Sequence, residues 1–239
     1  MTEKILRPDP ELELHLTDTG GAGRPVLALH GGAGPRGVAP VVEHFAPENR
    51  VLAPTHPGWG GTPRPEWFTG VDSLAVTYLD LLEDEDLTGV VVVASSFGGW
   101  VAAEMAVRDR GHRIGALVVL DGIGPQIAGL PVSLPQPPPG APTPGPGRGP
   151  APADLAAMQV YTGTTMGDPK LLRRLARVRI PALLIWGEDD TVVTPAFGAA
   201  YAAGFADARF EVVAGAGHMP AVQNPAATFE LIDEFLVKA

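Results

Sequence analysis

Residues 90–98 constrain the fold of this chain more than any other part of the sequence. Four consecutive valines, Val90–Val93, are followed at once by the stretch ASSFG, in which every residue except Phe97 is small, and a helix-like pattern begins at Trp100. A run of β-branched residues of this kind predicts a strand that is buried on both faces. The turn from such a strand into a helix brings backbones close together, so small side chains are required two residues before and after its apex. Ala94 and Gly98 hold those positions around Ser96, and the segment therefore predicts a sharp strand-to-helix turn with a hydroxyl at its apex.

Ser96, and not the adjacent Ser95, is the candidate nucleophile in this turn. The residue two positions after Ser95 is Phe97, whose ring is too large for a close backbone approach. Because helix formation begins just past Ser96, the amide of Phe97 points to the place where negative charge would develop on a substrate oxygen. Ser and Gly are also common in ordinary strand-to-helix loops, since they cap helices and form turns. The catalytic interpretation therefore depends on partners elsewhere in the chain.

The composition restricts the classes of function that the chain can have. Its 239 residues are 45% hydrophobic, which is enough for a sizeable buried core. The formal net charge is -10 and no basic stripe occurs, so we expect neither nucleic acid nor a stable membrane association. The absence of cysteine excludes disulfides, thiolate catalysis and cysteine-ligated metals. The first residues lack the apolar region of a signal peptide, and no apolar run approaches the roughly 20 residues of a membrane span, so we expect a cytoplasmic protein.

Short apolar runs alternate with helical patterns along most of the chain. The runs typical of buried strands are Val26–Leu29, Val51–Ala53, Val90–Ala94, Ala116–Leu120, Ala182–Trp186 and Arg209–Val213. The helical patterns cover Ser73–Leu82, Trp100–Val107, Ala196–Ala203 and Pro225–Val237, the last with Asn224 as its expected N-cap. This alternation predicts an α/β fold with a doubly wound, mostly parallel sheet. The period-two pattern of Leu12, Leu14 and Leu16 predicts an antiparallel strand at the edge of that sheet.

One segment interrupts this alternation. Between positions 131 and 152, fourteen of the 22 residues are Pro or Gly, so neither a helix nor a strand can run through it. A long insertion in a compact domain is usually a lid, a binding loop or disorder. The sequence thus predicts a core in two parts, residues 1–124 and 179–239, with a reduced lid insertion over residues 125–178. A flexible surface loop is the alternative.

Chemically useful residues follow three further predicted strands. Ligands in an open α/β sheet bind beyond the carboxyl ends of its strands. The first core strand ends in HGGAG (30–34), whose small residues allow backbone amides to approach a ligand. The last predicted strand leads into a Gly-rich loop that contains His218. Three candidate acids lie at the same edge, namely Asp121, Asp189 and Asp190.

With these residues in place, the chain resembles the α/β-hydrolase superfamily, in particular its lid-bearing members that use a serine. The order serine, acid, histidine along the chain is that family's order. The resemblance implies Ser96 as the nucleophile, Asp190 as the acid and His218 as the base. It also implies an oxyanion hole formed by the amides of Gly32 and Phe97. Asp189 and Asp121 remain rivals for the role of the acid.

The resemblance covers nearly the whole chain and is weakest between residues 125 and 179. Two positions depart from the family's pattern. Ala94 stands where the nucleophile signature has Gly, which adds one methyl group and leaves the chemistry in place. His56, in the stretch HPGWGGT (56–62), stands where an aspartate is more usual.

The residue types define the expected chemistry. A serine hydroxyl is a poor nucleophile at neutral pH, so His218 takes its proton during attack and later returns one to the leaving group. Asp190 orients the imidazole and stabilises its cation. We therefore expect a serine hydrolase without a cofactor that cleaves a small or medium acyl compound, most simply a carboxylic ester. The other histidines do not cluster with carboxylates at metal-ligand spacing, so we expect no metal; they include His30, His44, His56 and His112.

Apolar residues near the expected site indicate that the small-molecule substrate carries an uncharged, partly apolar acyl group. We expect Gly31, Trp59, Met166 and Met219 to contact it. Two alternatives stay open. One is a carbon–carbon hydrolase that cleaves vinylogous diketones, because the Gly-rich turn after His30 resembles the dienoate-cleaving branch of the family. The other is a hydrolase-fold ligand-binding protein without turnover. The sequence predicts no oligomeric state.

Overall fold

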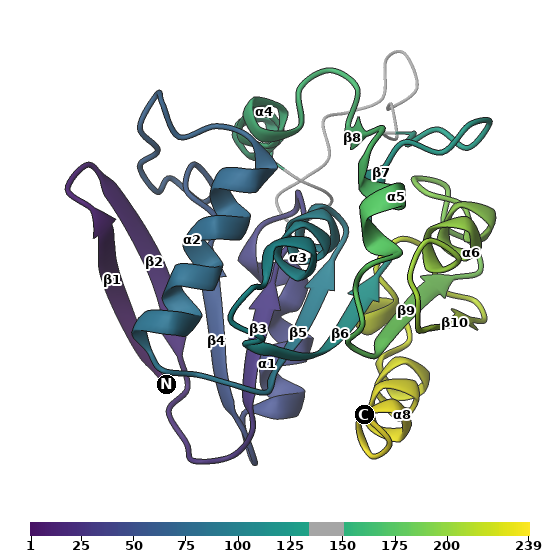
Figure 1. The fold of residues 1–239 in the computed structure, drawn as a ribbon, viewed down its shortest axis with the longest axis horizontal. Coiled ribbons are helices and arrows are strands. Elements are labelled where there is room, and N and C mark those ends of the chain that lie inside the picture. The colour runs from purple at the N-terminus through teal and green to yellow at the C-terminus, as the bar shows by residue number, and fades with distance from the viewer. Residues whose placement is uncertain (134–150) are drawn as a thin grey trace.

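One mixed β-sheet organises the protein (Figure 1), whose computed structural model describes residues 1–133 and 151–239. Across the sheet the strands lie in the order β1 (Thr2–Asp9), β2 (Leu12–Asp18), β4 (Arg50–Thr55), β3 (Pro25–Leu29), β5 (Val90–Ser95), β6 (Ile114–Leu120), β9 (Ala182–Gly187) and β10 (Ala208–Val213). β2 is antiparallel to both β1 and β4, whereas the other neighbours are parallel. The predicted doubly wound, mostly parallel α/β sheet is confirmed.

Helices cover both faces of this sheet. One face carries α2 (Val71–Asp84), α3 (Phe97–Arg108), α5 (Leu171–Leu175) and α6 (Pro195–Ala202). The other face carries the 3-10 turn η1 (Pro35–Val38), α1 (Ala39–Phe45), α7 (Pro220–Gln223) and α8 (Pro225–Leu236). Asn224 caps α8 as expected, because its side chain accepts a hydrogen bond from Ala227 N–H. Among the described residues, no helix combines the length and the apolar character needed to cross a membrane.

The valine run of β5 contributes to the hydrophobic cores on both faces of the sheet. Every residue of this strand is buried. Val90 and Val92 belong to the cluster beneath α2 and α3, and Val91 and Val93 belong to the cluster beneath α1 and α8. Because successive side chains of a strand point to opposite faces, a run of four apolar residues is what a two-sided core requires.

The antiparallel strand predicted around Leu12–Leu16 is present as β2, but its predicted place at the edge of the sheet was wrong. The three leucines of β2 are buried and the residues between them are partly exposed, in agreement with the period-two pattern. β1 pairs outside β2 and forms the edge. β1 carries mostly exposed charged and polar side chains, which is how edge strands avoid further pairing and why the segment gave no clear apolar pattern.

The segment between β6 and β9 contains β7 (Gly124–Pro125), α4 (Pro152–Thr162), β8 (Gly167–Asp168) and α5. The predicted Pro/Gly-rich insertion at 131–152 falls largely on positions 134–150, which lie outside the described residues. α4 packs over the carboxyl edge of the sheet, where the Tyr161 hydroxyl donates a hydrogen bond of 2.8 Å to Pro57 O. The division into a two-part core and a lid insertion stays a prediction.

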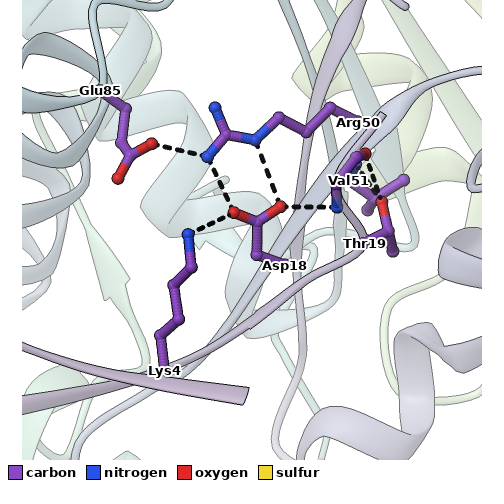
Figure 2. Close-up of polar contacts among 7 residues, drawn as sticks. Lys4, Asp18, Thr19, Arg50, Val51 and Glu85 are labelled. Atoms are coloured by element: carbon purple, nitrogen blue, oxygen red, sulfur yellow. Dashed lines mark hydrogen bonds and ion pairs between the residues drawn. The ribbon is translucent and has the colours of Figure 1, made fainter. Parts of the chain in front are cut away.

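A polar cluster, drawn in Figure 2, lies at the opposite, amino edge of the sheet, where the parallel strand β4 begins at Arg50. Asp18 ends β2 and pairs with β4 near the start of that strand. It accepts hydrogen bonds from Lys4 Nζ at 2.7 Å and from Arg50 Nε and Nη2 at 3.2 and 2.8 Å. Arg50 Nη2 also donates to Glu85, just beyond α2, at 2.6 Å. The bonds from Arg50 hold the pKa of the Asp18 carboxyl well below its usual range, so this buried charge ties β1, β2, β4 and α2 together.

Candidate active site

Ser96 lies in a strained turn between β5 and α3. Its φ is 52° and its ψ is -115°, a combination that residues other than glycine rarely adopt. Backbone hydrogen bonds hold the turn: Ser96 N–H donates to Leu120 O at 2.9 Å, and Ser96 O accepts from the N–H groups of Gly99 at 2.9 Å and Ile123 at 3.1 Å. The predicted strand-to-helix turn is therefore present, and its strain is offset by bonds to the neighbouring strand and the loop after it.

Close backbone contacts explain the small residues around Ser96. A Cβ atom on Gly98 would lie 2.4 Å from Leu29 O and 2.7 Å from His30 O. A Cβ atom on Gly31, in the loop that faces the turn, would lie 2.8 Å from Ser96 Cβ. Neither position can carry a side chain without a shift of the surrounding backbone. Gly98 therefore has the steric role that its place in the sequence predicted, and Gly31 has the same role on the opposite loop.

Ser96, His218 and Asp190 form a continuous hydrogen-bonded series. His218 Nε2 lies 2.9 Å from Ser96 Oγ, and its Nδ1 lies 2.8 Å from Asp190 Oδ2. Because a carboxylate can only accept, Nδ1 carries the proton and donates to Asp190, which leaves Nε2 to accept from the Ser96 hydroxyl. The three side chains come from the loops after β5, β9 and β10. The structure thus brings together the three residues that the sequence puts forward for catalysis.

Backbone amides as well as His218 hold the Asp190 carboxylate. Its Oδ1 accepts from the N–H groups of Val192 at 2.7 Å and Val193 at 3.1 Å. Burial opposes the charged form of Asp190, but the hydrogen bonds that it accepts, above all the one from His218, outweigh burial, so the pKa of this carboxyl is lowered from its ordinary value. The rival Asp189 is exposed, and the hydrogen bond of His218 goes to Asp190 instead.

The second rival, Asp121, is fully buried at the end of β6 beside Asp190. One oxygen of each carboxyl and one ring nitrogen of His218 all lie within 4.8 Å of one another. Asp121 Oδ1 accepts from Gly187 N–H at 2.9 Å. Burial, reinforced by the neighbouring Asp190, raises the pKa of Asp121 to about 9. Within residues 1–133 and 151–239 this is the one group of three side chains spaced like metal ligands, and the His218–Asp190 hydrogen bond already accounts for two of them.

Two backbone amides were put forward for an oxyanion hole, those of Phe97 and Gly32. Phe97 is the first residue of α3, and amides in the first turn of a helix have no partner within the helix. The peptide between Gly31 and Gly32 is fixed through its carbonyl, which accepts from His30 Nδ1 at 2.8 Å and from Gly34 N–H at 3.0 Å. In a planar trans peptide the N–H points opposite to the C=O, so these bonds also fix the direction of Gly32 N–H.

A buried network that the sequence analysis missed supports this loop. His56 N–H donates to His30 Nε2 at 3.0 Å, so His30 carries its proton on Nδ1 and donates it to Gly31 O. His56 Nε2 donates to His30 O at 2.9 Å, and its Nδ1 accepts from the Tyr78 hydroxyl. Burial lowers the pKa of His30 to about 4 and lowers that of His56 as well, so both rings are neutral at pH 7. The signal in the sequence was His56 itself, at a position where an aspartate is more usual.

An apolar cavity of about 280 Å³ adjoins Ser96 and His218. Three of the four residues expected to contact a substrate line it, namely Gly31, Met166 and Met219. Met158 of α4 lines it too, although no pattern in the sequence pointed to this residue. Among the described lining residues none is Asp, Glu, Lys or Arg. The cavity therefore suits an uncharged, apolar group.

The expectation that Trp59 contacts the substrate was wrong. Its side chain is fully buried and does not line the cavity. The indole ring stacks on Phe97 and Tyr161, with ring centroids 5.4 and 5.6 Å away. Its Nε1 donates to Gly32 O at 3.2 Å. Trp59 thus packs against the Gly32 loop and supports it, because a partner for both its ring and its N–H is available there.

Known proteins resemble this chain in sequence and in fold. The model of the alpha/beta hydrolase family matches residues 26–231. A 2-hydroxy-6-oxo-2,4-heptadienoate hydrolase of Pseudomonas putida is 34% identical over 119 residues, which cover 47% of this chain and 42% of that protein. A 2-hydroxy-6-oxononadienedioate/2-hydroxy-6-oxononatrienedioate hydrolase of Cupriavidus pinatubonensis is 26% identical over 273 aligned positions, covering 95% of this chain and 92% of that protein. Among solved structures, a variant of a meta-cleavage product hydrolase shares the fold, with a TM-score of 0.77 over 99% of this chain and 98% of that one at 17% identity.

Proposed function

Because the chain belongs to the alpha/beta hydrolase family, we propose that it is a serine hydrolase acting on a small or medium uncharged acyl compound, most simply a carboxylic ester. The observation that carries this proposal is the 2.9 Å hydrogen bond between Ser96 Oγ and His218 Nε2 beside an apolar cavity. The Ser96 hydroxyl donates a hydrogen bond to one imidazole nitrogen, and the other nitrogen of that ring donates to a carboxylate. This is the arrangement that activates a serine nucleophile. No cofactor is needed for this chemistry.

In the first half-reaction Ser96 Oγ attacks the carbonyl carbon while its proton passes to His218 Nε2. Asp190 stabilises the resulting imidazolium through Nδ1. The oxyanion of the tetrahedral intermediate is bound by the amides of Phe97 and Gly32, and each such donor contributes roughly 3 kcal/mol to transition-state stabilisation. The intermediate then collapses, the bond to the leaving alkoxide breaks, and the alkoxide takes the proton from His218. An acyl group remains on Ser96.

Water completes the cycle with the same groups. Its oxygen attacks the acyl carbon while one of its protons passes to His218 Nε2. When the second tetrahedral intermediate collapses, the bond to Ser96 Oγ breaks and the serine takes that proton back. The products are one carboxylic acid and one alcohol, and the site returns to its starting state.

The cavity supports an apolar acyl group. Its described lining contains no Asp, Glu, Lys or Arg side chain. Met158, Met166 and Met219 contribute flexible thioether chains that adapt to ligands of different shape. Sites of this kind obtain affinity from apolar contact and use a few polar groups for orientation.

A series of p-nitrophenyl esters with acyl chains from acetate to dodecanoate tests the proposal. We expect kcat/KM to rise from acetate to butyrate or hexanoate and to fall at dodecanoate, because the longest chain exceeds a cavity of about 280 Å³. Met158→Ala enlarges the cavity without touching Ser96 or His218, so it is expected to move the optimum to longer chains. Ser96→Ala is the control and is expected to be inactive on all of them. Activity confined to charged acyl groups would contradict the proposal.

A second candidate is carbon–carbon bond hydrolysis of a dienoate. It is supported by the names of the Pseudomonas putida and Cupriavidus pinatubonensis hydrolases described above and by the HGGAG loop. The substrates in those names carry a carboxylate, for which the described cavity lining provides no Lys or Arg. Incubation with 2-hydroxy-6-oxo-2,4-heptadienoate, followed by its absorbance, separates the two candidates. Turnover that is faster than on every ester, and that is lost in Ser96→Ala, would favour the carbon–carbon hydrolase.

A further inference from the structure

Asp121 is a buried titratable residue that the proposed reaction does not use. It is fully buried at the end of β6 and has a positive φ of 46°. Its Oδ1 accepts from Gly187 N–H at 2.9 Å, whereas its buried Oδ2 has no hydrogen-bond partner among residues 1–133 and 151–239. Its neighbour is Asp190, and one oxygen of each carboxyl lies within 4.8 Å of the other and of a ring nitrogen of His218.

Two carboxyls this close together in a buried place cannot both carry a charge. The single negative charge of the pair is more stable on Asp190, because the oxygens of Asp190 accept hydrogen bonds from two backbone N–H groups and from His218. Asp121 has a single backbone donor, from Gly187. A proton on Asp121 Oδ2 converts an unpaired acceptor into a donor, and the carboxylate of Asp190 is the acceptor beside it.

We propose that Asp121 is a neutral carboxylic acid that donates its proton to Asp190 and so holds the Asp190 carboxylate in position for His218. This inference rests on the proposed function, because it concerns the acid of that site. Asp121 acts through Asp190 and is therefore a positioning residue. Burial, reinforced by the charge of Asp190, raises the pKa of Asp121 to about 9, which agrees with a neutral group at pH 7.

Ionisation of Asp121 changes the site in two ways. It removes the donor that Asp190 uses, and it places a second negative charge beside Asp190 where little water screens the repulsion. Among the described residues, the acidic and histidine side chains grouped with Asp121 are Asp190, from the loop after β9, and His218, from the loop after β10. Tyr201 of α6 packs near the adjacent Gly122, with a ring carbon 3.5 Å from the place of a Cβ on that glycine. We therefore expect the reactivity of Ser96 to fall when Asp121 loses its proton.

Three variants separate a neutral acid from a charged one. Asp121→Asn reproduces both hydrogen bonds of the neutral acid, since its amide oxygen accepts from Gly187 and its amide nitrogen donates to Asp190, and it cannot ionise. Asp121→Ala removes both bonds. Asp190→Asn removes the charge that orients His218. The readout is the second-order rate of labelling of Ser96 by a fluorophosphonate between about pH 6 and pH 10, together with the thermal midpoint over the same range.

At pH 7 we expect Asp121→Asn to be labelled within about 3-fold of the wild-type rate, Asp121→Ala at least about 10-fold more slowly, and Asp190→Asn about 1,000-fold more slowly. Above about pH 9 the wild-type rate is expected to fall, whereas Asp121→Asn keeps its rate. The thermal midpoint gives a second readout. Because the folded wild type retains a proton that the unfolded chain has lost, its stability falls as the pH rises toward 9, and that of Asp121→Asn falls less.

Several results overturn the proposal. If Asp121→Asn lowers the labelling rate of Ser96 as much as Asp190→Asn does, Asp121 acts as an anion. If Asp121→Ala is labelled at the wild-type rate, Asp121 has no role in the site. An alkaline fall of equal size in wild type and Asp121→Asn assigns that fall to another group. Absence of labelling in the folded wild type is a different outcome, which contradicts the proposed function. The dependence of the thermal midpoint on pH still decides the protonation state of Asp121 in that case.

Discussion

Two equally buried aspartates are held in different ways at the two edges of the sheet. Asp18 and Asp190 are each 4% exposed. Asp18, at the amino edge, accepts from Lys4 and from the guanidinium of Arg50, so two cations compensate its charge (Figure 2). Asp190, at the carboxyl edge, accepts from two backbone N–H groups and from His218, none of which carries a fixed charge.

The donor groups decide what each charge can do. A guanidinium does not lose its proton at any ordinary pH, so the charge of Asp18 is permanently paired and stabilises the fold. An imidazole can gain a proton, so the charge of Asp190 remains available to a cation that forms only during a reaction. The same residue type therefore serves stability at one edge of the sheet and chemistry at the other.

The largest effect that we expect from this contrast concerns activity at the carboxyl edge. Asp190→Asn is expected to lower kcat/KM for the best ester by about 1,000- to 10,000-fold, because an amide neither fixes the tautomer of His218 nor stabilises its cation. The thermal midpoint is expected to change little, since the amide oxygen can still accept from Val192 and Val193. Asp189→Asn, at the exposed neighbouring position, is the matched control and should behave like wild type. If the kcat/KM of Asp190→Asn stays within 10-fold of wild type, a loss of at most about 1.4 kcal/mol in transition-state stabilisation, the catalytic role of Asp190 is contradicted.

The opposite result is expected at the amino edge. Asp18→Ala leaves Lys4 and Arg50 without their buried partner, so the free energy of unfolding in urea is expected to fall by about 3 kcal/mol. The value of kcat/KM per folded molecule is expected to stay unchanged, because the site lies at the other edge. Asp207→Ala removes an exposed aspartate and serves as the control. A loss of activity without a loss of stability would contradict the assignment of Asp18 to the fold.

The stability that Asp18 provides has a defined dependence on pH. Its pKa is lowered in the folded state, chiefly by Arg50, so its contribution is fully present above the unfolded pKa of about 3.9 and is lost as the pH falls toward the folded pKa. The difference in unfolding free energy between wild type and Asp18→Asn is therefore expected to be constant from pH 7 to about pH 5 and to shrink below about pH 4. Urea unfolding at several pH values measures it, and a difference that grows in acid contradicts this reasoning.

The smallest effect is expected from the neutral network behind the site. Tyr78→Phe removes the hydroxyl that donates to His56 Nδ1, which costs about 1 kcal/mol of stability and leaves a buried acceptor unpaired. We expect kcat to fall only a few-fold, since His30 still holds Gly31 O. Tyr201→Phe is the control, because the buried Tyr201 hydroxyl has no partner in the described part of the chain. Equal effects of the two substitutions on kcat would show that the network does not support the loop.

The turn at Ser96 could be predicted from the sequence because each of its requirements is local. Val90–Val93 define a strand buried on both faces, and Gly98 is small because two carbonyls approach it. The rule that strand ends meet at one edge of a parallel sheet brought the three candidate acids and His218 to the same edge, and the resemblance to the α/β-hydrolase superfamily then selected Asp190 and His218. Their hydrogen-bonded geometry agrees with that rule.

Features that depend on contacts between distant segments could not be predicted. Trp59 was expected to contact the substrate because it is an apolar residue near the expected site, but the sequence does not reveal that its N–H reaches Gly32 O. The pairing of His56 with Tyr78 joins a loop to α2, and the approach of Asp121 to Asp190 joins the ends of two strands. β1 was missed as the edge strand because exposed strands carry little apolar periodicity.

Fluorophosphonate labelling decides whether Ser96 is an activated nucleophile. Wild type and Ser96→Ala are treated in parallel, and the adduct is located by intact and peptide mass after folding has been verified by circular dichroism. We expect a single adduct on the peptide that contains Ser96 in wild type and none in Ser96→Ala. No adduct on folded wild-type protein would contradict the serine-hydrolase mechanism and would favour a hydrolase-fold protein that binds its ligand without turnover.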